Sequence, residues 1–178
     1  MKNLSLDYKK LIICFFLYSI IGWLYEVFLE VVIYQWGFTN RGVLFGPYCP
    51  IYGFGATIFV LLFYKYKTIK NEHPIIKIIS LFLGCMFIAT FIELIASFIL
   101  EFFLGHWLWL TFADYAINFQ GRIALSPSIR FGLGGLLFLY IIQPLFDKIL
   151  NKCNPQILKI ITCLILIIFS VDCLYTFI

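Results

Sequence analysis

Long apolar runs, separated by short segments that carry most of the charges, make up this chain. A helix needs roughly 20 apolar residues to cross the hydrocarbon core of a bilayer, and several of the runs reach that length. They predict about five transmembrane helices, at about residues 11–34, 46–64, 78–104, 129–147 and 158–177. We therefore expect an all-α integral membrane protein that forms a single transmembrane domain over residues 1–178, with an interfacial segment at about 105–127.

The composition supports this prediction. Hydrophobic residues make up 63% of the 178 residues, charged residues only 12%, and the mean hydropathy is +1.00. A soluble domain of this size would expose far too much apolar surface to water. The first apolar run is too long for the core of a signal peptide and has no small-residue cleavage site, so we expect it to be retained as a helix.

The basic residues predict the orientation of the chain. All lysines fall in the N-terminal segment and in the two loops that follow the second and fourth predicted helices: Lys2, Lys9, Lys10, Lys65, Lys67, Lys70, Lys77, Lys148, Lys152 and Lys159. The positive-inside rule places these segments in the cytoplasm of a multi-pass cell-membrane protein, with the N-terminus cytoplasmic and the C-terminus outside. The net charge of +4 then reflects topology and contact with lipid headgroups, and we expect no nucleic-acid partner.

The arginines lie on the opposite side, among glycines and apolar residues: Arg41, Arg122 and Arg130. Acidic residues within the predicted helices are their candidate partners: Glu26, Glu30, Glu93, Glu101 and Asp172. A charge inside a membrane costs at least a few kcal/mol (about 2.5–3.5 on insertion scales) unless it is paired or faces water. These residues are therefore candidates for a functional site.

Two of the predicted helices carry a polar stripe. Gly22, Glu26 and Glu30 recur every four residues in the first, and Glu93, Ser97 and Glu101 do so in the third, so each set lines one helix face. Glu26 follows Lys10 by 16 residues and Glu93 follows Lys77 by 16, which places both about 24 Å from their lysine at 1.5 Å per residue. We expect the two carboxylates at the same depth, in the outer half of the membrane.

The stripes belong to a candidate internal repeat. Aligning Glu30 with Glu101 also aligns Trp36 with Trp107, and each half then reaches an arginine next to a glycine and, after it, a proline. This pattern predicts a parallel repeat of two helices plus a fifth helix, with the repeat axis along the membrane normal. Chance similarity between two apolar helices is the alternative.

The stretch from Asn40 to Ala56 is rich in residues that disfavour regular helix. Two prolines lack backbone donors and Gly53 and Gly55 follow, so the second helix should begin irregularly. Irregular backbone at membrane depth is tolerated where it is buried in protein or lines a cavity, which suggests an outward-facing polar cavity. In it Arg41 and Arg122 would be fixed cations, and the glutamates would be their partners or ligands of a proton or another cation. Close helix packing is the alternative, because Gly42 and Gly46 are four residues apart and Gly132, Gly134 and Gly135 occur in the fourth helix.

The connection "GHWLWLTFADYAINFQGRIALSPS" mixes aromatic and polar residues. This mixture suits the membrane interface, where aromatic rings lie at the level of the headgroups. We consider two interpretations: an interfacial belt, and a lid over a site that the two polar stripes form.

The motifs "GWLYEVFLE" and "NRGVLFGPYCPIYGFGA", with weaker support from "FQGRIALSPSIRFGLGG", resemble the signature of the bacterial family of type IV ABC-transporter permeases of the CmpB kind, which has eukaryotic transmembrane relatives. The resemblance implies a transporter permease component. It points to motif residues without giving them roles: Gly22, Trp23, Glu26, Asn40, Arg41, Gly42, Gly46, Pro47, Cys49, Pro50, Tyr52 and Gly53. Since the sequence has no Gly-x-x-x-x-Gly-Lys-[Ser/Thr] loop, such a transporter would need a separate ATPase subunit.

Three functions follow from these observations. The first is a permease component, in a homo-oligomer or with an ATPase, whose polar cavity binds a small polar or ionic solute through Glu26, Glu30, Asn40, Arg41, Glu93, Glu101 and Arg122. The second is an enzyme or binding protein that acts on a lipid headgroup, with arginines that grip phosphate and a glutamate as acid or base. The third is a structural subunit in which the charges form ion pairs.

Other chemistry has little support in the sequence. The six cysteines form no C-x-x-C pair, neither His73 nor His106 has metal-ligand spacing, and Ser126 and Ser128 have no histidine nearby for a triad. We therefore expect no metal and no cofactor, and the sequence favours a protein that is not itself an enzyme.

Overall fold

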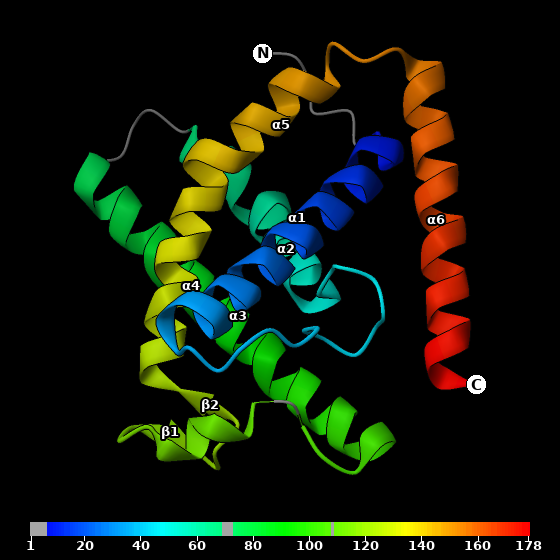
Figure 1. Cartoon of the computed structure of the whole chain (residues 1–178). Coiled ribbons are helices and arrows are strands. Elements are labelled where there is room, and N and C mark those ends of the chain that lie inside the picture. The colour runs from blue at the N-terminus through cyan, green and yellow to red at the C-terminus, as the bar shows by residue number, and fades with distance from the viewer. Residues whose placement is uncertain (1–6, 69–72, 108) are drawn as a thin grey trace. The chain divides into compact units, whose positions relative to one another are not determined.

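The computed structural model describes residues 7–68, 73–107 and 109–178. These residues are mainly helical and include one antiparallel pair of very short strands (Figure 1). In chain order the elements are α1 (Tyr8–Phe28), η1 (Leu29–Ile33), α2 (Pro50–Lys67), α3 (Pro74–Leu104), η2 (Leu110–Asp114), β1 (Asn118–Phe119), β2 (Ile123–Ala124), α4 (Leu125–Leu137), η3 (Phe138–Ile142), α5 (Gln143–Leu150) and α6 (Pro155–Phe177).

The prediction of an all-α membrane protein is confirmed. In the described part of the chain, four helical stretches are long and apolar enough to cross a membrane: Tyr8–Ile33, Pro74–Leu104, Leu125–Leu150 and Pro155–Thr176. They correspond to the first, third, fourth and fifth predicted helices. The second corresponds to α2, which is shorter and carries Lys65 and Lys67 in its last turn, and it does not reach the same length and apolarity.

Several helix ends follow from local sequence signals. The Asp7 side chain accepts a hydrogen bond from the Lys9 amide (3.2 Å) at the start of α1, and Asn154 accepts one from the Gln156 amide (2.8 Å) at the start of α6. Pro74 occupies the first turn of α3, where its missing donor is harmless. Gly105, with φ of 75°, ends α3 in the left-handed conformation.

The second helix begins later than predicted, at Pro50 and not near residue 46. Pro47 and Pro50 both lack a backbone donor, and the chain before Pro50 is irregular. Gly42 and Gly46 lie in this irregular loop, so the interpretation of these two glycines as a helix-packing face is wrong. Residues 34–49 form one long connection in its place (Figure 1).

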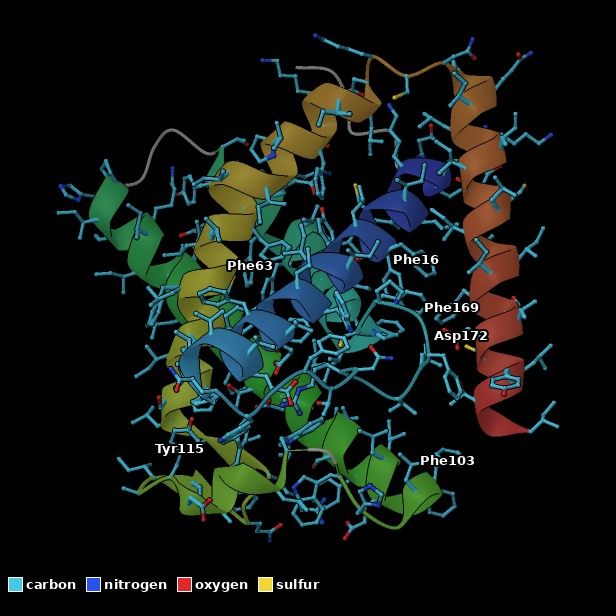
Figure 2. The ribbon with its side chains drawn as sticks, in the orientation of Figure 1. Phe16, Phe63, Phe103, Tyr115, Phe169 and Asp172 are labelled. Carbon is cyan, nitrogen blue, oxygen red and sulfur yellow. The ribbon has the colours of Figure 1, made fainter. Side chains whose placement is uncertain are left out.

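The chain divides into two compact units. The first contains the described residues of Met1–Thr57 together with Leu145–Ile178. In it the Phe16 ring of α1 contacts the Phe169 ring of α6, with centroids 5.2 Å apart (Figure 2). Helix α1 also packs closely on α2, because a Cβ atom at Gly22 would lie 2.2 Å from Cγ of Tyr52 and one at Gly53 would lie 2.3 Å from Oγ of Ser19.

The second unit is Ile58–Pro144 and is centred on the contact between α3 and α4. Glycines of α4 allow this contact: an added Cβ would lie 2.6 Å from the Phe82 ring at Gly132 and 2.4 Å from Cβ of Cys85 at Gly135. Small residues at such positions let membrane helices approach closely. Thr90 and Ser128 add a hydrogen bond between their hydroxyl groups (2.8 Å) across the same contact.

Candidate functional site

Glu30 and Arg41 form an ion pair within the first unit. Nη2 of Arg41 lies 2.7 Å from Oε1 of Glu30, and the Thr39 hydroxyl donates to the same oxygen at 2.6 Å. Glu30 lies in the π-helical turn η1, where a bond from the Tyr34 amide to the Leu29 carbonyl widens the end of α1. The Glu30 side chain is only 4% exposed, whereas that of Arg41 is 32% exposed. We call Glu30, Thr39 and Arg41 the first cluster.

Asn40 fixes the loop that carries Arg41. Its side chain accepts a hydrogen bond from Nε1 of Trp23 (2.8 Å) and donates to the carbonyls of Leu44 (3.2 Å) and Phe45 (3.0 Å). Gly42 has φ of 94°, which favours glycine, and it lies against the Cys49 thiol. The motif residues Trp23, Asn40 and Gly42 therefore shape the backbone that presents Arg41.

Glu26 does not pair with an arginine. It accepts a hydrogen bond from the Tyr52 hydroxyl on α2, and no described residue forms an ion pair with it. The Tyr52 ring packs against Gly22 and contacts the Tyr25 ring edge-on, with centroids 6.3 Å apart. The expectation of an arginine partner for Glu26 is wrong, because Arg41 reaches Glu30 one turn further along.

Asp172 also has a different partner from the one expected. Its carboxylate accepts hydrogen bonds from the amides of Phe45 (3.0 Å) and Gly46 (2.9 Å) and from the Tyr48 hydroxyl, so α6 holds the end of the loop. Burial, followed by the hydrogen bond to Asp172, raises the pKa of the Tyr48 phenol. Figure 2 shows Asp172 on the side of α6 that faces α1. Sequence reasoning missed Tyr48, which is separated from Asp172 by 124 residues.

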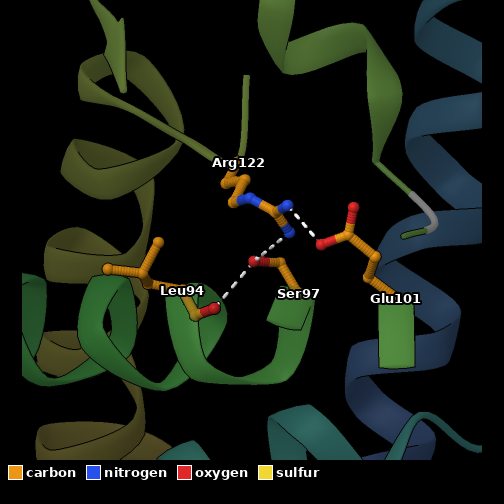
Figure 3. Close-up of polar contacts among 4 residues, drawn as sticks. All are labelled: Leu94, Ser97, Glu101 and Arg122. Atoms are coloured by element: carbon orange, nitrogen blue, oxygen red, sulfur yellow. Dashed lines mark hydrogen bonds and ion pairs between the residues drawn. The ribbon is translucent and has the colours of Figure 1, made fainter. Parts of the chain in front are cut away.

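Arg122 is the centre of an equivalent arrangement in the second unit (Figure 3). It forms an ion pair with Glu101, and its Nη1 donates to Oγ of Ser97 at 3.3 Å. The guanidinium carbon lies 4.2 Å from the centre of the Phe98 ring and 4.1 Å from that of Trp107. We call these five residues the second cluster. The Arg122 side chain is only 9% exposed.

The remaining candidates of this unit lie outside the second cluster. Glu93 is buried on α3 and is not among the ion-pair partners of Arg122. Arg130 donates from Nη2 to the hydroxyls of Tyr115 (3.3 Å) and Ser126 (3.4 Å). That Glu26 and Glu93 lie at the same depth stays a prediction.

The two clusters agree with the predicted repeat alignment. Glu30 corresponds to Glu101 in that alignment, and each acid binds the arginine that follows it in its own half. The environments differ, since Arg122 is enclosed by two aromatic rings and Arg41 is partly open. Only the first cluster keeps an accessible cation.

The predicted polar cavity stays a prediction. Two shallow hollows lie along α6, lined by Val171, Leu174, Tyr175 and Ile178 and by Gln156, Lys159, Ile160, Cys163 and Leu164. Neither contains a predicted site residue. In residues 7–68, 73–107 and 109–178, no three His, Cys, Asp or Glu side chains are grouped as a metal site would require.

The connection after α3 forms a 3₁₀ helix, η2, and a hairpin between β1 and β2. Gln120 (φ 54°) and Gly121 (φ 64°) make its turn, and Nε1 of Trp109 donates to the Arg122 carbonyl at 2.8 Å. Ile117 and Phe119 are exposed, as the interfacial interpretation expects. The choice between belt and lid stays a prediction.

Comparison with known proteins gives one match. Residues 13–177 match the family described as "Putative ABC-transporter type IV". No curated protein and no solved structure matches the chain. The matched range includes both clusters and Asp172, so it extends beyond the two helices whose motifs carry the resemblance in the sequence.

Proposed function

Because the chain belongs to the family described as "Putative ABC-transporter type IV", we propose that it is the membrane-spanning permease component of a transporter in the cell membrane. The sequence has no phosphate-binding loop of the Walker type, so ATP hydrolysis must come from a separate ATPase subunit. The four long apolar helices account for the membrane-embedded part. A homo-oligomer of this chain is part of the proposal, as two copies would supply a larger set of helices around a pathway.

The solute site of this proposal is the first cluster. The observation that carries it is the 32% exposure of Arg41, a cation that is held by the 4% exposed Glu30. A charge at the end of a transmembrane segment requires a partner or water, and a guanidinium binds carboxylate and phosphate groups well. Arg41 would exchange part of its contact with Glu30 for an anionic group of the solute. Asn40 and Gly42 would keep the loop in the conformation that allows this exchange.

The second cluster has a different role in the proposal. The guanidinium of Arg122 contacts two aromatic rings, a hydroxyl and a carboxylate. Few of its hydrogen-bond donors are therefore left for a ligand. We assign Arg122 to anchoring the segment before α4, and not to solute binding. The two halves would then have diverged, one toward binding and the other toward support.

The orientation in this proposal follows the lysines. It places the N-terminus and the turn between α5 and α6 in the cytoplasm and the C-terminus outside. In the first unit, Nζ of Lys10 donates to Oδ1 of Asn151 at 2.7 Å, which joins the start of α1 to that turn. Lys148 and Lys152 are exposed there, so this basic surface is where the ATPase would bind.

The first test is purification of the tagged protein from its native membrane in mild detergent, followed by mass spectrometry of proteins and lipids. We expect an ATPase in stoichiometric amount. The double variant Lys148→Glu/Lys152→Glu should lose the ATPase, and Arg41→Gln, which changes the opposite end of α1, should retain it. Recovery without an ATPase, but with an enriched anionic or isoprenoid lipid, would contradict the permease proposal and favour the lipid-headgroup alternative.

The second test addresses the solute site. Metabolite and lipid profiles of a deletion strain are compared with those of strains that carry the wild type, Arg41→Lys or Arg41→Gln. We expect the wild type to restore the level of a small anionic solute, Arg41→Gln to fail and Arg41→Lys to restore part of it, because lysine keeps the charge but not the planar donor pair. A change confined to lipids would contradict solute transport.

A further inference from the structure

Glu26 differs in its hydrogen-bond partner from three other acids of the transmembrane segments, Glu30, Glu101 and Asp172. Glu30 and Glu101 each bind an arginine, and Asp172 binds two backbone amides. Glu26 lies on α1 within the apolar segment Tyr8–Ile33, and its hydrogen-bond partner among the described residues is the neutral hydroxyl of Tyr52. It is therefore a carboxyl group within a membrane-spanning segment that forms no ion pair with a described residue.

Three neutral groups lie around Glu26, and the cation nearby is bound to another acid. Tyr52 and Cys49 lie on the side of α2, and Tyr25 is its neighbour on α1. Burial and, to a smaller extent, the Glu26 charge raise the pKa of Cys49 to about 12 against the opposing effect of Arg41, so this thiol stays protonated. The nearby cation, Arg41, is already bound to Glu30. An ionised carboxylate within a membrane-spanning segment is unfavourable unless it is paired or faces water, and uptake of a cation removes that penalty.

The contacts favour a proton over a metal ion as that cation. Ca²⁺ requires roughly six to eight oxygen ligands and Mg²⁺ about six, whereas the described residues bring one phenol oxygen to Glu26. In the same residues no group of three acidic, histidine or cysteine side chains could hold a metal. A proton needs one acceptor oxygen only.

We propose that Glu26 is a reversible proton-binding site, with Tyr52 holding its carboxyl group in place. In the binding step the carboxylate takes one proton from the aqueous phase and one O–H bond forms, which gives the neutral acid. In the release step the same bond breaks and the proton returns to water. Tyr52 keeps its own proton throughout and donates to the carboxyl group in both states.

This site would couple protons to the solute of the proposed permease, and in that respect it rests on the proposed function. Glu26 on α1 and Glu30 on η1 are four residues apart, and the charges of both Glu26 and Arg41 act on Cys49. With Glu26 neutral, Arg41 is balanced by Glu30 alone and attracts an anion more strongly than with a second negative charge nearby. Proton binding and anion binding then favour each other, as linkage requires.

The test uses dicyclohexylcarbodiimide, which reacts with protonated carboxyl groups in apolar surroundings. The purified full-length protein in lipid nanodiscs is treated over a series of pH values, and the adduct is located by tandem mass spectrometry. We expect one adduct at Glu26 whose yield falls by at least about tenfold from the acidic to the alkaline end of the series, as single-proton loss predicts. Glu26→Gln should abolish it, whereas Tyr52→Phe should keep the adduct and move its pH dependence.

Glu30→Gln is the matched control, because it alters a neighbouring acid and should leave the Glu26 adduct in place. An adduct that does not vary with pH, or its complete absence from Glu26 at every pH, would overturn the proposal. The measurement needs neither solute nor ATPase. Recovery of an ATPase without the adduct would therefore reject the proton site alone, and the adduct without an ATPase would reject the permease alone.

Discussion

Arg41 lies 2.7 Å from Glu30, the residue that precedes it by eleven positions, and the pair closes a loop at the end of α1. The second half of the chain contains the same relationship between Arg122 and Glu101. The two pairs differ in surroundings, since two aromatic rings lie against the guanidinium of Arg122 whereas Arg41 is partly open. This difference decides what each pair should do when it is altered.

Removing one partner of the first pair should harm the protein more than removing both. Glu30→Gln leaves the Arg41 cation without its partner, and Arg41→Gln leaves the buried Glu30 carboxylate without its partner. The double variant removes both charges. Breaking a charged hydrogen bond of this kind costs about 1.5–3 kcal/mol, with further loss from the unpaired group. We expect the double variant to be more stable than the sum of the two single effects predicts, with a coupling of about 1–2 kcal/mol.

The measurement is the free energy of unfolding of the wild type and the three variants, from titration with a denaturing detergent in mixed micelles. A strictly additive cycle would show that the two side chains do not interact. The same cycle on Glu101 and Arg122 is the matched comparison, and its coupling should be reduced by the 42% exposure of Glu101.

Replacing Arg122 by lysine should destabilise the second unit although the charge is kept. Lysine cannot place a planar group between Phe98 and Trp107 while it also reaches Ser97 and Glu101. Loss of the ring contacts should lower the free energy of unfolding by about 1–2 kcal/mol. Detergent-induced unfolding followed by tryptophan fluorescence measures it. Arg41→Lys, which changes a guanidinium that is 32% exposed, should have the smaller effect, and the reverse order would refute the structural role of Arg122.

The helices and one arginine site per half could be predicted from the sequence because both depend on local patterns. Apolar runs of membrane length predict helices, and buried charges require partners, so the acids of the helices were candidate partners of the arginines and the repeat alignment matched Glu30 with Glu101. The partner of each acid was less predictable. Glu26 and Glu30 are equivalent on a regular helix face, and the π-helical turn at Glu30 distinguishes them.

Contacts between distant segments could not be predicted. Asp172 bonds to backbone amides 126 and 127 residues earlier, and backbone groups leave no signal in a list of charged residues. The late start of α2 has a similar cause, because the prolines show that the helix is interrupted but not where it resumes. These contacts depend on how the helices pack, and the hydrophobic periodicity of the sequence does not specify that packing.

Substitution of Gly22 by alanine should weaken the contact between α1 and α2. A Cβ at this position would lie 2.2–2.5 Å from three atoms of the Tyr52 side chain, so the helices must move apart. Such overpacking costs about 1–3 kcal/mol and should show as a lower free energy of unfolding. Gly55→Ala is the control, because a Cβ at Gly55 meets no atom within 4 Å and alanine favours the helix. Equal losses in the two variants would show that Tyr52 is not the cause.

Asparagine in place of Asp172 should loosen the loop between η1 and α2. The carboxylate accepts from two amides and from Tyr48, and an uncharged amide group offers one acceptor oxygen and weaker bonds. The buried Cys49 reports the change, since its thiol has a pKa of about 12 from burial and reacts only when the loop opens. Loss of about 1.5–3 kcal/mol of charged hydrogen bonding should raise the rate of maleimide labelling of Cys49 roughly tenfold or more.

Peptide mass spectrometry separates Cys49 from the other five cysteines, and Cys49→Ser confirms the assignment. Thr176→Ala, which removes only a 3.4 Å bond to the same carboxylate, should change the rate little. An unchanged rate in Asp172→Asn would mean that α6 does not hold the loop and that Arg41 is positioned by Asn40 and Glu30 alone.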